Sequence, residues 1–140
     1  DWPNVLEVAQ ENATAAGVAD RFGTRPGSAF EVDLGTDHAV VLLTNFLHHF
    51  DPKTNEGLLQ RVYAALAPGG HAVACEFVPD ETRVVPPEAA GFSLTMLATT
   101  PHGDAYTLHE YREMYCAAGF ADVSLADLSP APQRALIATK

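Results

Sequence analysis

The chain has 140 residues, of which 47% are hydrophobic and 19% charged, so its composition is that of one globular domain with a buried core. Eighteen acidic and eight basic residues give a formal net charge of −10, which disfavours binding to nucleic acid or to an anionic membrane surface. Apolar runs are too short to span a membrane and no signal segment opens the sequence, so we expect a cytoplasmic protein.

The first quarter of the chain predicts a helix followed by a weak strand. Pro3 near the first turn, an apolar stripe and Gly17 as a stop signal predict a helix that begins at Pro3. The segment Arg21–Arg25 is a short candidate strand, followed by the turn Pro26-Gly27-Ser28 and a polar stretch.

The middle of the chain predicts a strand, a helix and a second strand. The continuous apolar run Ala39–Leu43 is typical of a strand buried on both faces of a parallel sheet. Asp51 can cap the next helix, with Pro52 at its first position, and Pro68-Gly69-Gly70 is expected to end it. A strand over His71–Phe77 completes a right-handed crossover unit.

The last third predicts two helices and a pair of strands. An apolar helix over Ala89–Thr99 is expected to cover the site, and Thr107 with Glu110 matches a capping box that begins a helix ending at Gly119. Two strands joined by a short proline-containing link are expected to form an antiparallel pair: Asp122–Leu128 and Arg134–Thr139. The predicted fold class is α/β, a doubly wound, mostly parallel sheet with an antiparallel C-terminal strand.

A histidine pair follows the Ala39–Leu43 strand. Ligands of open α/β sheets bind at the carboxyl ends of strands, so His48 lies where chemistry is expected. A metal site is not expected, because His48 and His49 are adjacent on an extended segment and point in opposite directions. The two cysteines, Cys75 and Cys116, also lack metal-site spacing and are expected to be buried, reduced thiols.

The glycine-rich turn of a nucleotide-binding domain is absent from this sequence. Such a domain normally opens with a strand, a glycine-rich turn and a helix, whereas this chain begins at what resembles the end of a second strand. Gly69-Gly70 cannot replace that turn, because it follows a helix and enters a strand. We therefore expect an N-terminally truncated fragment.

A set of short motifs, in this order and spacing, resembles class I S-adenosylmethionine-dependent methyltransferases, and among them the C-terminal domain of caffeic-acid-type small-molecule O-methyltransferases. The motifs are Asp1-Trp2-Pro3, Gly27-Ser28-Ala29-Phe30, Asn45-Phe46-Leu47-His48-His49-Phe50, Leu66-Ala67-Pro68-Gly69-Gly70 and Glu76-Phe77-Val78-Pro79. The resemblance covers nearly all 140 residues. It implies a Rossmann-like methyltransferase sheet, methyl transfer to a hydroxyl of a small aromatic or polyketide-like metabolite, and a homodimer.

The resemblance also implies which residues bind S-adenosylmethionine. They are Asp1, Trp2, Ser28, Ala29, Thr44 and Asn45. Asp1 would bind the ribose hydroxyls, since a carboxylate can accept two hydrogen bonds and an acidic residue ending the second strand is the usual ribose ligand in this architecture. Trp2 would pack on the adenine, with Ser28 and Ala29 near its edge.

By the same resemblance, His48 and Glu76 are the catalytic pair. His48 would be the general base and Glu76 the carboxylate that orients it; each follows or ends one of two strands joined by a single crossover helix, and such strands are normally neighbours. An imidazole is largely neutral at pH 7 and can accept the proton of the acceptor hydroxyl. A carboxylate on its other nitrogen fixes the tautomer and stabilises the imidazolium.

The acceptor pocket is the part where the sequence departs from the family. Phe92 and Met96 correspond to residues that line that pocket. A second acidic residue common in the family is replaced by Ala105, with Asp104 adjacent, and Ser28 stands where an aspartate is common. These departures leave the acceptor open.

Several alternatives remain. His48 could be structural, Glu76 could form an ion pair with Arg83, and Phe92 and Met96 could be core residues. A nicotinamide-dependent oxidoreductase would need a Tyr-x-x-x-Lys pair, and a hydrolase a G-x-S-x-G turn; neither occurs. A non-catalytic, methyltransferase-like binding or dimerisation module is the remaining alternative.

Overall fold

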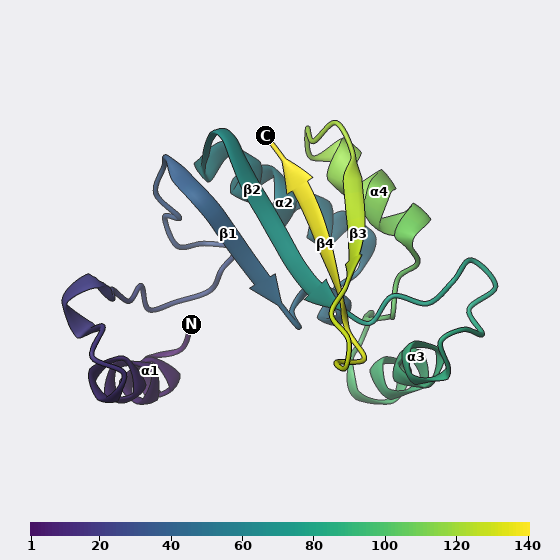
Figure 1. The fold of residues 1–140 in the computed structure, drawn as a ribbon, viewed down its shortest axis with the longest axis horizontal. Helices are drawn as coiled ribbons and strands as arrows, with labels where there is room; N and C mark the ends of the chain where they lie inside the picture. Colours follow the sequence, from purple (N-terminus) through teal and green to yellow (C-terminus); the bar gives the residue numbers. More distant parts are fainter. The chain divides into compact units, whose positions relative to one another are not determined.

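The computed structural model describes all 140 residues, which form two compact units, Asp1–Leu34 and Gly35–Lys140. The larger unit holds the sheet, and Figure 1 labels its elements. No helix combines the length and hydrophobicity needed to cross a membrane.

The smaller unit contains α1 (Pro3–Ala15) and a single-turn helix, η1 (Ala19–Arg21). Proline at the first position confirms the predicted start of α1. The predicted strand at Arg21–Arg25 is wrong. Phe22 has extended dihedral angles (φ −109°, ψ 128°), but the segment has no neighbouring strand with which to form a hydrogen-bonded ladder.

The larger unit is built on a mixed four-stranded sheet in the order β1-β2-β4-β3. The strands are β1 (His38–Thr44), β2 (Leu66–Glu76), β3 (Val123–Asp127) and β4 (Arg134–Thr139). β1 and β2 are parallel, whereas β4 is antiparallel to both of its neighbours. The predicted antiparallel C-terminal strand is therefore confirmed.

The crossover between β1 and β2 is α2 (Pro52–Ala65). Asp51 caps it as predicted, because its side chain accepts a hydrogen bond from the Thr54 amide (3.0 Å). The helix ends before the Pro68-Gly69-Gly70 segment, which instead lies within β2 and corrects the expected boundary. Gly70 is needed there because a Cβ would lie 2.7 Å from the carbonyl oxygen of His38 on β1.

The C-terminal end of α2 is closed by a side chain from the far end of the chain. Lys140 Nζ donates to the carbonyl oxygens of Leu66 (2.6 Å) and Ala64 (3.4 Å), and it lies 5.1 Å from the centre of the Tyr63 ring. A cation at this position stabilises the negative end of the helix dipole.

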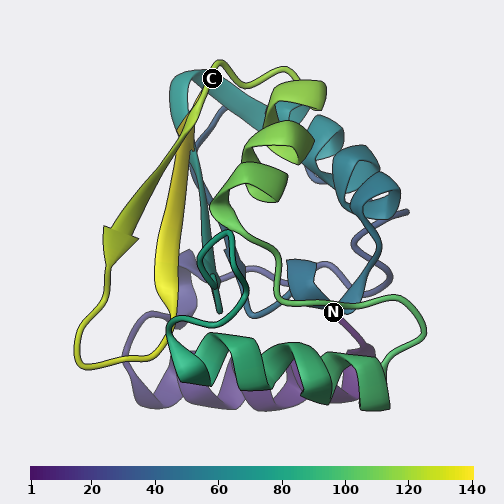
Figure 2. The same ribbon diagram turned by 90° about the vertical axis from the view of Figure 1, so that its right-hand side faces the viewer.

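Two helices pack on one face of the sheet (Figure 2). They are α2 and α4 (Leu108–Ala117), and their buried side chains include Leu58, Leu59, Val62, Tyr111, Met114 and Tyr115. On the opposite face of β1, Val40 and Leu42 are 51% and 65% exposed. The expectation that this strand is buried on both faces is therefore wrong, because the helices of this unit that pack on the sheet cover one face.

The helix α3 (Pro87–Thr99) begins two residues earlier than predicted. It lies near the carboxyl end of β2 (Figure 1). Phe92 on this helix stacks on Phe77, which follows β2, with ring centres 4.1 Å apart. This position confirms an apolar helix at the end of the sheet where ligands bind in α/β folds. Leu94 and Leu97 on the same helix are largely exposed.

The capping box of α4 generates a stability prediction. Thr107 Oγ1 accepts from the Glu110 amide (3.3 Å), and the Thr107 amide donates to Glu110 Oε2 (2.7 Å). Thr107→Ala should lower the free energy of unfolding by about 1 kcal/mol, measured by urea denaturation, because one amide loses its acceptor. Thr107→Ser should retain most of the stability; equal losses in both variants would contradict the capping role.

Candidate active site

His48 and Glu76 are in contact at the carboxyl end of two neighbouring parallel strands. His48 lies in η2 (Leu47–His49), a single turn that follows β1, and Glu76 is the last residue of β2. His48 Nδ1 lies 2.5 Å from Glu76 Oε2, and both side chains are buried. The structure thus brings the two side chains together as the sequence predicts.

The Glu76 carboxylate has three hydrogen-bond donors. Oε1 accepts from the backbone amides of Phe46 (2.9 Å) and Leu47 (2.8 Å), and Oε2 faces the imidazole. A buried carboxylate without donors would be very costly, and these groups remove that cost. A carboxylate at Nδ1 favours the imidazole tautomer that carries its proton on Nδ1, and in that tautomer Nε2 is the proton acceptor.

The ring and main chain of His48 are held from several sides. Phe92 approaches the imidazole edge-on with ring centres 4.8 Å apart, and the His49 ring centre lies at 4.3 Å. The carbonyl oxygen of His48 accepts from the Asp104 amide (3.0 Å). Met96 is buried on α3, and no ring contact or hydrogen bond joins its side chain to His48.

Partial burial and the neighbouring imidazole of His48 lower the pKa of His49. Desolvation is the main cause and His48 the second, while Glu76 acts in the opposite direction. His49 is nevertheless exposed, whereas His48 is buried. Of the histidine pair, only His48 has the carboxylate contact that suits a general base.

Arg83 does not pair with Glu76, so that alternative is wrong. Its Nη1 donates to Asp104 Oδ2 (2.9 Å), and its Nη2 donates to Glu110 Oε1 (2.6 Å) and Oε2 (2.8 Å). Partial burial acts to lower the pKa of Arg83, but the two carboxylates together raise it. The sequence offered one signal for this cluster: Arg83 is the only Lys or Arg between Arg61 and Arg112.

The residues around the expected second acid have other roles. Ala105 is fully buried, and the Asp104 carboxylate accepts from Arg83 and from the Ser93 hydroxyl. Neither residue therefore supplies a second carboxylate to His48. The carboxylate partner of His48 is Glu76.

Two segments of the smaller unit that hold predicted cofactor residues, residues 1–2 and 28–29, lie close together. The Asp1 carboxylate accepts from the Trp2 amide (2.7 Å), and the Gly27 amide donates to the Asp1 carbonyl oxygen (2.9 Å). Ser28 follows directly and its Oγ accepts from the Phe30 amide (3.2 Å). Trp2 is 60% exposed, so most of its indole is accessible to a ligand.

The other predicted cofactor residues belong to the larger unit. Thr44 and Asn45 are exposed at the carboxyl end of β1, and the Asn45 amide donates to the Cys75 carbonyl oxygen (2.9 Å). Asn45 has a positive φ of 52°, which turns the chain from the strand into η2. Ala29, the remaining predicted residue, is half-buried in the smaller unit.

Comparison with known proteins decides the family. Residues 1–121 match the family described as the O-methyltransferase domain. The chain belongs to this O-methyltransferase family. It is 34% identical over 123 residues to 3-hydroxy-5-methyl-1-naphthoate 3-O-methyltransferase of Streptomyces sahachiroi, covering 88% of this chain and 35% of the relative.

Solved structures of this family have the same fold. A proposed O-methyltransferase from Nostoc punctiforme PCC 73102 superposes with a TM-score of 0.97 at 53% identity, over 100% of this chain and 43% of that protein. Human N-acetylserotonin methyltransferase in complex with S-adenosylmethionine gives a TM-score of 0.76 at 27% identity, over 88% of this chain and 36% of that protein. The chain thus spans well under half the length of these relatives.

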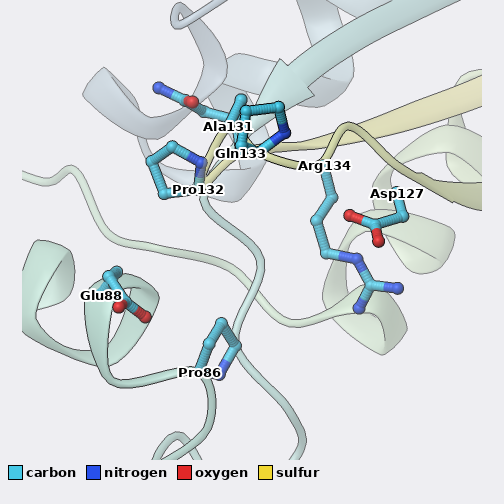
Figure 3. Close-up of a pocket in the computed structure, with 8 residues that line it drawn as sticks. Pro86, Glu88, Asp127, Ala131, Pro132, Gln133 and Arg134 are labelled. Atoms are coloured by element: carbon cyan, nitrogen blue, oxygen red, sulfur yellow. The ribbon is translucent and has the colours of Figure 1, made fainter.

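A surface cavity of 420 Å³ lies between the start of α3 and the β3–β4 turn (Figure 3). Its lining includes Pro86 and Glu88 on one side and Asp127, Pro132 and Arg134 on the other. None of the sequence-predicted site residues lines it. No group of three or more His, Cys, Asp or Glu side chains is arranged to hold a metal ion.

The hydrogen bonds of Glu76 predict a stability effect. Glu76→Gln preserves the shape, but the amide has one acceptor oxygen and one donor group. It cannot satisfy both the backbone amides of Phe46 and Leu47 and the His48 Nδ1 proton. The free energy of unfolding should fall by about 1 to 3 kcal/mol, measured by urea denaturation.

A matched control for this substitution is Glu113→Gln on α4. Glu113 is exposed and lies 3.6 Å from His109, so its replacement should change the stability by less than about 0.5 kcal/mol. Equal midpoints for Glu76→Gln and the unmodified protein would contradict the hydrogen-bonding role of the buried carboxylate.

Three buried tyrosines predict a loss of stability at high pH. Burial is the main cause that raises the pKa of Tyr106 from 10.0 to about 12, and it also raises the pKa of Tyr111 and Tyr115. The fold therefore favours the neutral phenols, so their contribution is present below pH 10 and is lost as the pH rises toward 12.

Circular dichroism and ultraviolet absorbance recorded together test this dependence. Tyrosine ionisation above pH 10 should accompany loss of the fold. The Tyr106 hydroxyl donates to the Phe50 carbonyl oxygen (2.6 Å), and Tyr106→Phe should make the loss less steep by removing one ionisable phenol. Ionisation of all tyrosines near pH 10 with the fold intact would contradict it.

Proposed function

We propose that this chain is the C-terminal part of a class I methyltransferase catalytic domain, with a doubly wound sheet in the whole protein. In this proposal the protein transfers a methyl group from S-adenosylmethionine to a hydroxyl of a small aromatic or polyketide-like metabolite. The contact between His48 Nδ1 and the buried Glu76 carboxylate carries the proposal, because it leaves Nε2 as a proton acceptor at the ligand-binding edge of the sheet.

The exposed groups at the predicted cofactor positions fit S-adenosylmethionine. Asp1 offers a carboxylate for the ribose hydroxyls, and the accessible indole of Trp2 can stack on the adenine. Thr44 and Asn45 offer polar groups at the end of β1, with Ser28 and Ala29 near the adenine edge. When bound, the cofactor supplies a methyl group on an electrophilic sulfonium centre.

His48 would act as the general base. Its Nε2 removes the proton of the acceptor hydroxyl, and the resulting oxygen is the stronger nucleophile for displacement at the methyl carbon. Glu76 stabilises the imidazolium that forms and holds the ring in one orientation. Once the methyl group has been transferred, the proton leaves His48 to solvent and the base is restored.

The surroundings of His48 support a flat, apolar acceptor. Phe92 contacts the imidazole and stacks on Phe77, and Met96 lies one turn further along α3. Aromatic rings and a thioether favour contact with an aromatic ring. The relative from Streptomyces sahachiroi is named as acting on a hydroxynaphthoate, which agrees with this acceptor class.

We also propose that the protein is cytoplasmic and forms a homodimer through α3. Leu94 and Leu97 are 68% and 77% exposed, and they lie three residues apart on the helix. Two apolar side chains on one exposed face favour contact with another apolar surface, such as that of a second copy.

The test of the function uses the full-length protein that contains this chain. Methyl transfer from labelled S-adenosylmethionine to a panel of small phenols should be detected. His48→Gln should lower kcat by about 10²-fold or more because the base is lost, while the dissociation constant of the cofactor, measured by calorimetry, stays unchanged.

His49→Gln is the matched control for the general base. Its ring is exposed and forms no hydrogen bond or ion pair with a carboxylate, so kcat should change by less than about threefold. Equal turnover for His48→Gln and the unmodified enzyme would assign His48 a structural role. Absence of methyl transfer by the unmodified protein, with cofactor still bound, would favour a non-catalytic binding module.

A further inference from the structure

Arg83 joins segments of the larger unit that are distant in sequence. It lies in the loop between β2 and α3, where Asp80 Oδ1 accepts from the amides of Val84 and Val85 (3.1 Å each). This local structure holds Arg83 at a positive φ of 58°. From there its guanidinium forms hydrogen bonds to the Asp104–Ala105 segment and to Glu110 on α4.

The Asp104 contact leads directly to His48. The Asp104 side chain binds Arg83, and its backbone amide donates to the His48 carbonyl oxygen (3.0 Å). The preceding residue, Gly103, packs so closely that a Cβ would lie 2.2 Å from the same oxygen. The main chain at residues 103–104 therefore forms one wall behind the histidine.

The Asp104 carboxylate is also linked, through Ser93, to Phe92, whose ring contacts the His48 imidazole. The Ser93 hydroxyl on α3 donates to Asp104 Oδ1, while Arg83 occupies Oδ2. Phe92, next to Ser93, contacts the imidazole of His48 edge-on. Asp104 thus connects to both the main chain and the ring face of His48, and Arg83 fixes the position of Asp104.

We propose that Arg83 is a positioning residue which, through Asp104, sets the orientation of the His48 imidazole toward the acceptor. This inference rests on the proposed function of His48. Arg83 and Asp104 are each about one-third exposed, so the pair contributes little to stability by itself. A small displacement of a base from its proton can nevertheless reduce the rate about 10²-fold.

The Glu110 contact provides an internal control. Glu110 also binds Arg83 through both carboxylate oxygens, but it caps α4 and its side chain forms no hydrogen bond with residues 103–104 or with His48. If Arg83 had only a structural role, replacing Asp104 or Glu110 should affect kcat to the same extent. A positioning role requires Asp104.

The experiment compares Arg83→Lys, Asp104→Asn and Glu110→Gln in the full-length protein, at temperatures where circular dichroism shows each to be folded. Lysine keeps the charge but cannot reproduce the two-sided guanidinium contact. Arg83→Lys and Asp104→Asn should each lower kcat about 10-fold or more, with an unchanged cofactor dissociation constant. The double variant should be no worse than the more affected single variant.

Glu110→Gln should lower the melting temperature and leave kcat within about twofold. A second readout is independent of methyl transfer: the proton NMR resonance of His48 Nδ1–H, assigned with His48→Gln. That resonance should shift in Arg83→Lys and Asp104→Asn and stay in place in Glu110→Gln.

These readouts separate the two proposals. If the resonance shifts in Arg83→Lys and Asp104→Asn while the unmodified protein shows no methyl transfer, the positioning inference is supported and the proposed function is rejected. An active enzyme in which Arg83→Lys and Asp104→Asn change neither kcat nor the resonance would overturn the positioning inference. Equal losses of kcat in all three variants, tracking the melting temperature, would also overturn it.

Discussion

The fold around the site depends on one buried carboxylate. Glu76 ends a strand in the interior, where an ionised group is tolerated only with a full set of donors. Two of those donors are main-chain amides of the turn after β1, so the turn must keep its conformation for the charge to remain buried. The imidazole of His48 is the third donor. Satisfying Glu76 and orienting His48 are consequently the same structural event.

The structure gives His48 a single carboxylate partner. Where the family resemblance leads one to expect an acidic side chain, Ala105 is buried, and the carboxylate of the neighbouring Asp104 accepts from Arg83. The ring of His48 is therefore oriented by one carboxylate and contacted by Phe92, while the main chain of residues 103–104 packs against the His48 carbonyl oxygen. One hydrogen-bonded carboxylate and steric contacts therefore hold His48, where the resemblance predicts two carboxylates.

Local signals in the sequence predicted most elements and the central contact. The capping box at Thr107, the Asp51-Pro52 start of α2 and the meeting of His48 with Glu76 depend on short-range chemistry or on neighbouring strands. The errors involve partners distant in sequence. The Arg21–Arg25 segment lacks a pairing strand, Gly70 belongs to a ladder, and Arg83 finds its partners 21 and 27 residues away. No periodicity encodes such choices.

Lys140, the residue after β4, links the end of that strand to the C-terminal end of the crossover helix α2. Its ammonium group donates to the carbonyl oxygens at the C-terminal end of the crossover helix. If the β3–β4 hairpin separated from the sheet, those oxygens would lose their cation. The hairpin and the crossover should consequently open as one cooperative unit. Since that crossover leads directly into the strand that bears Glu76, Lys140 is joined through α2 and β2 to the strand end where His48 and Glu76 meet.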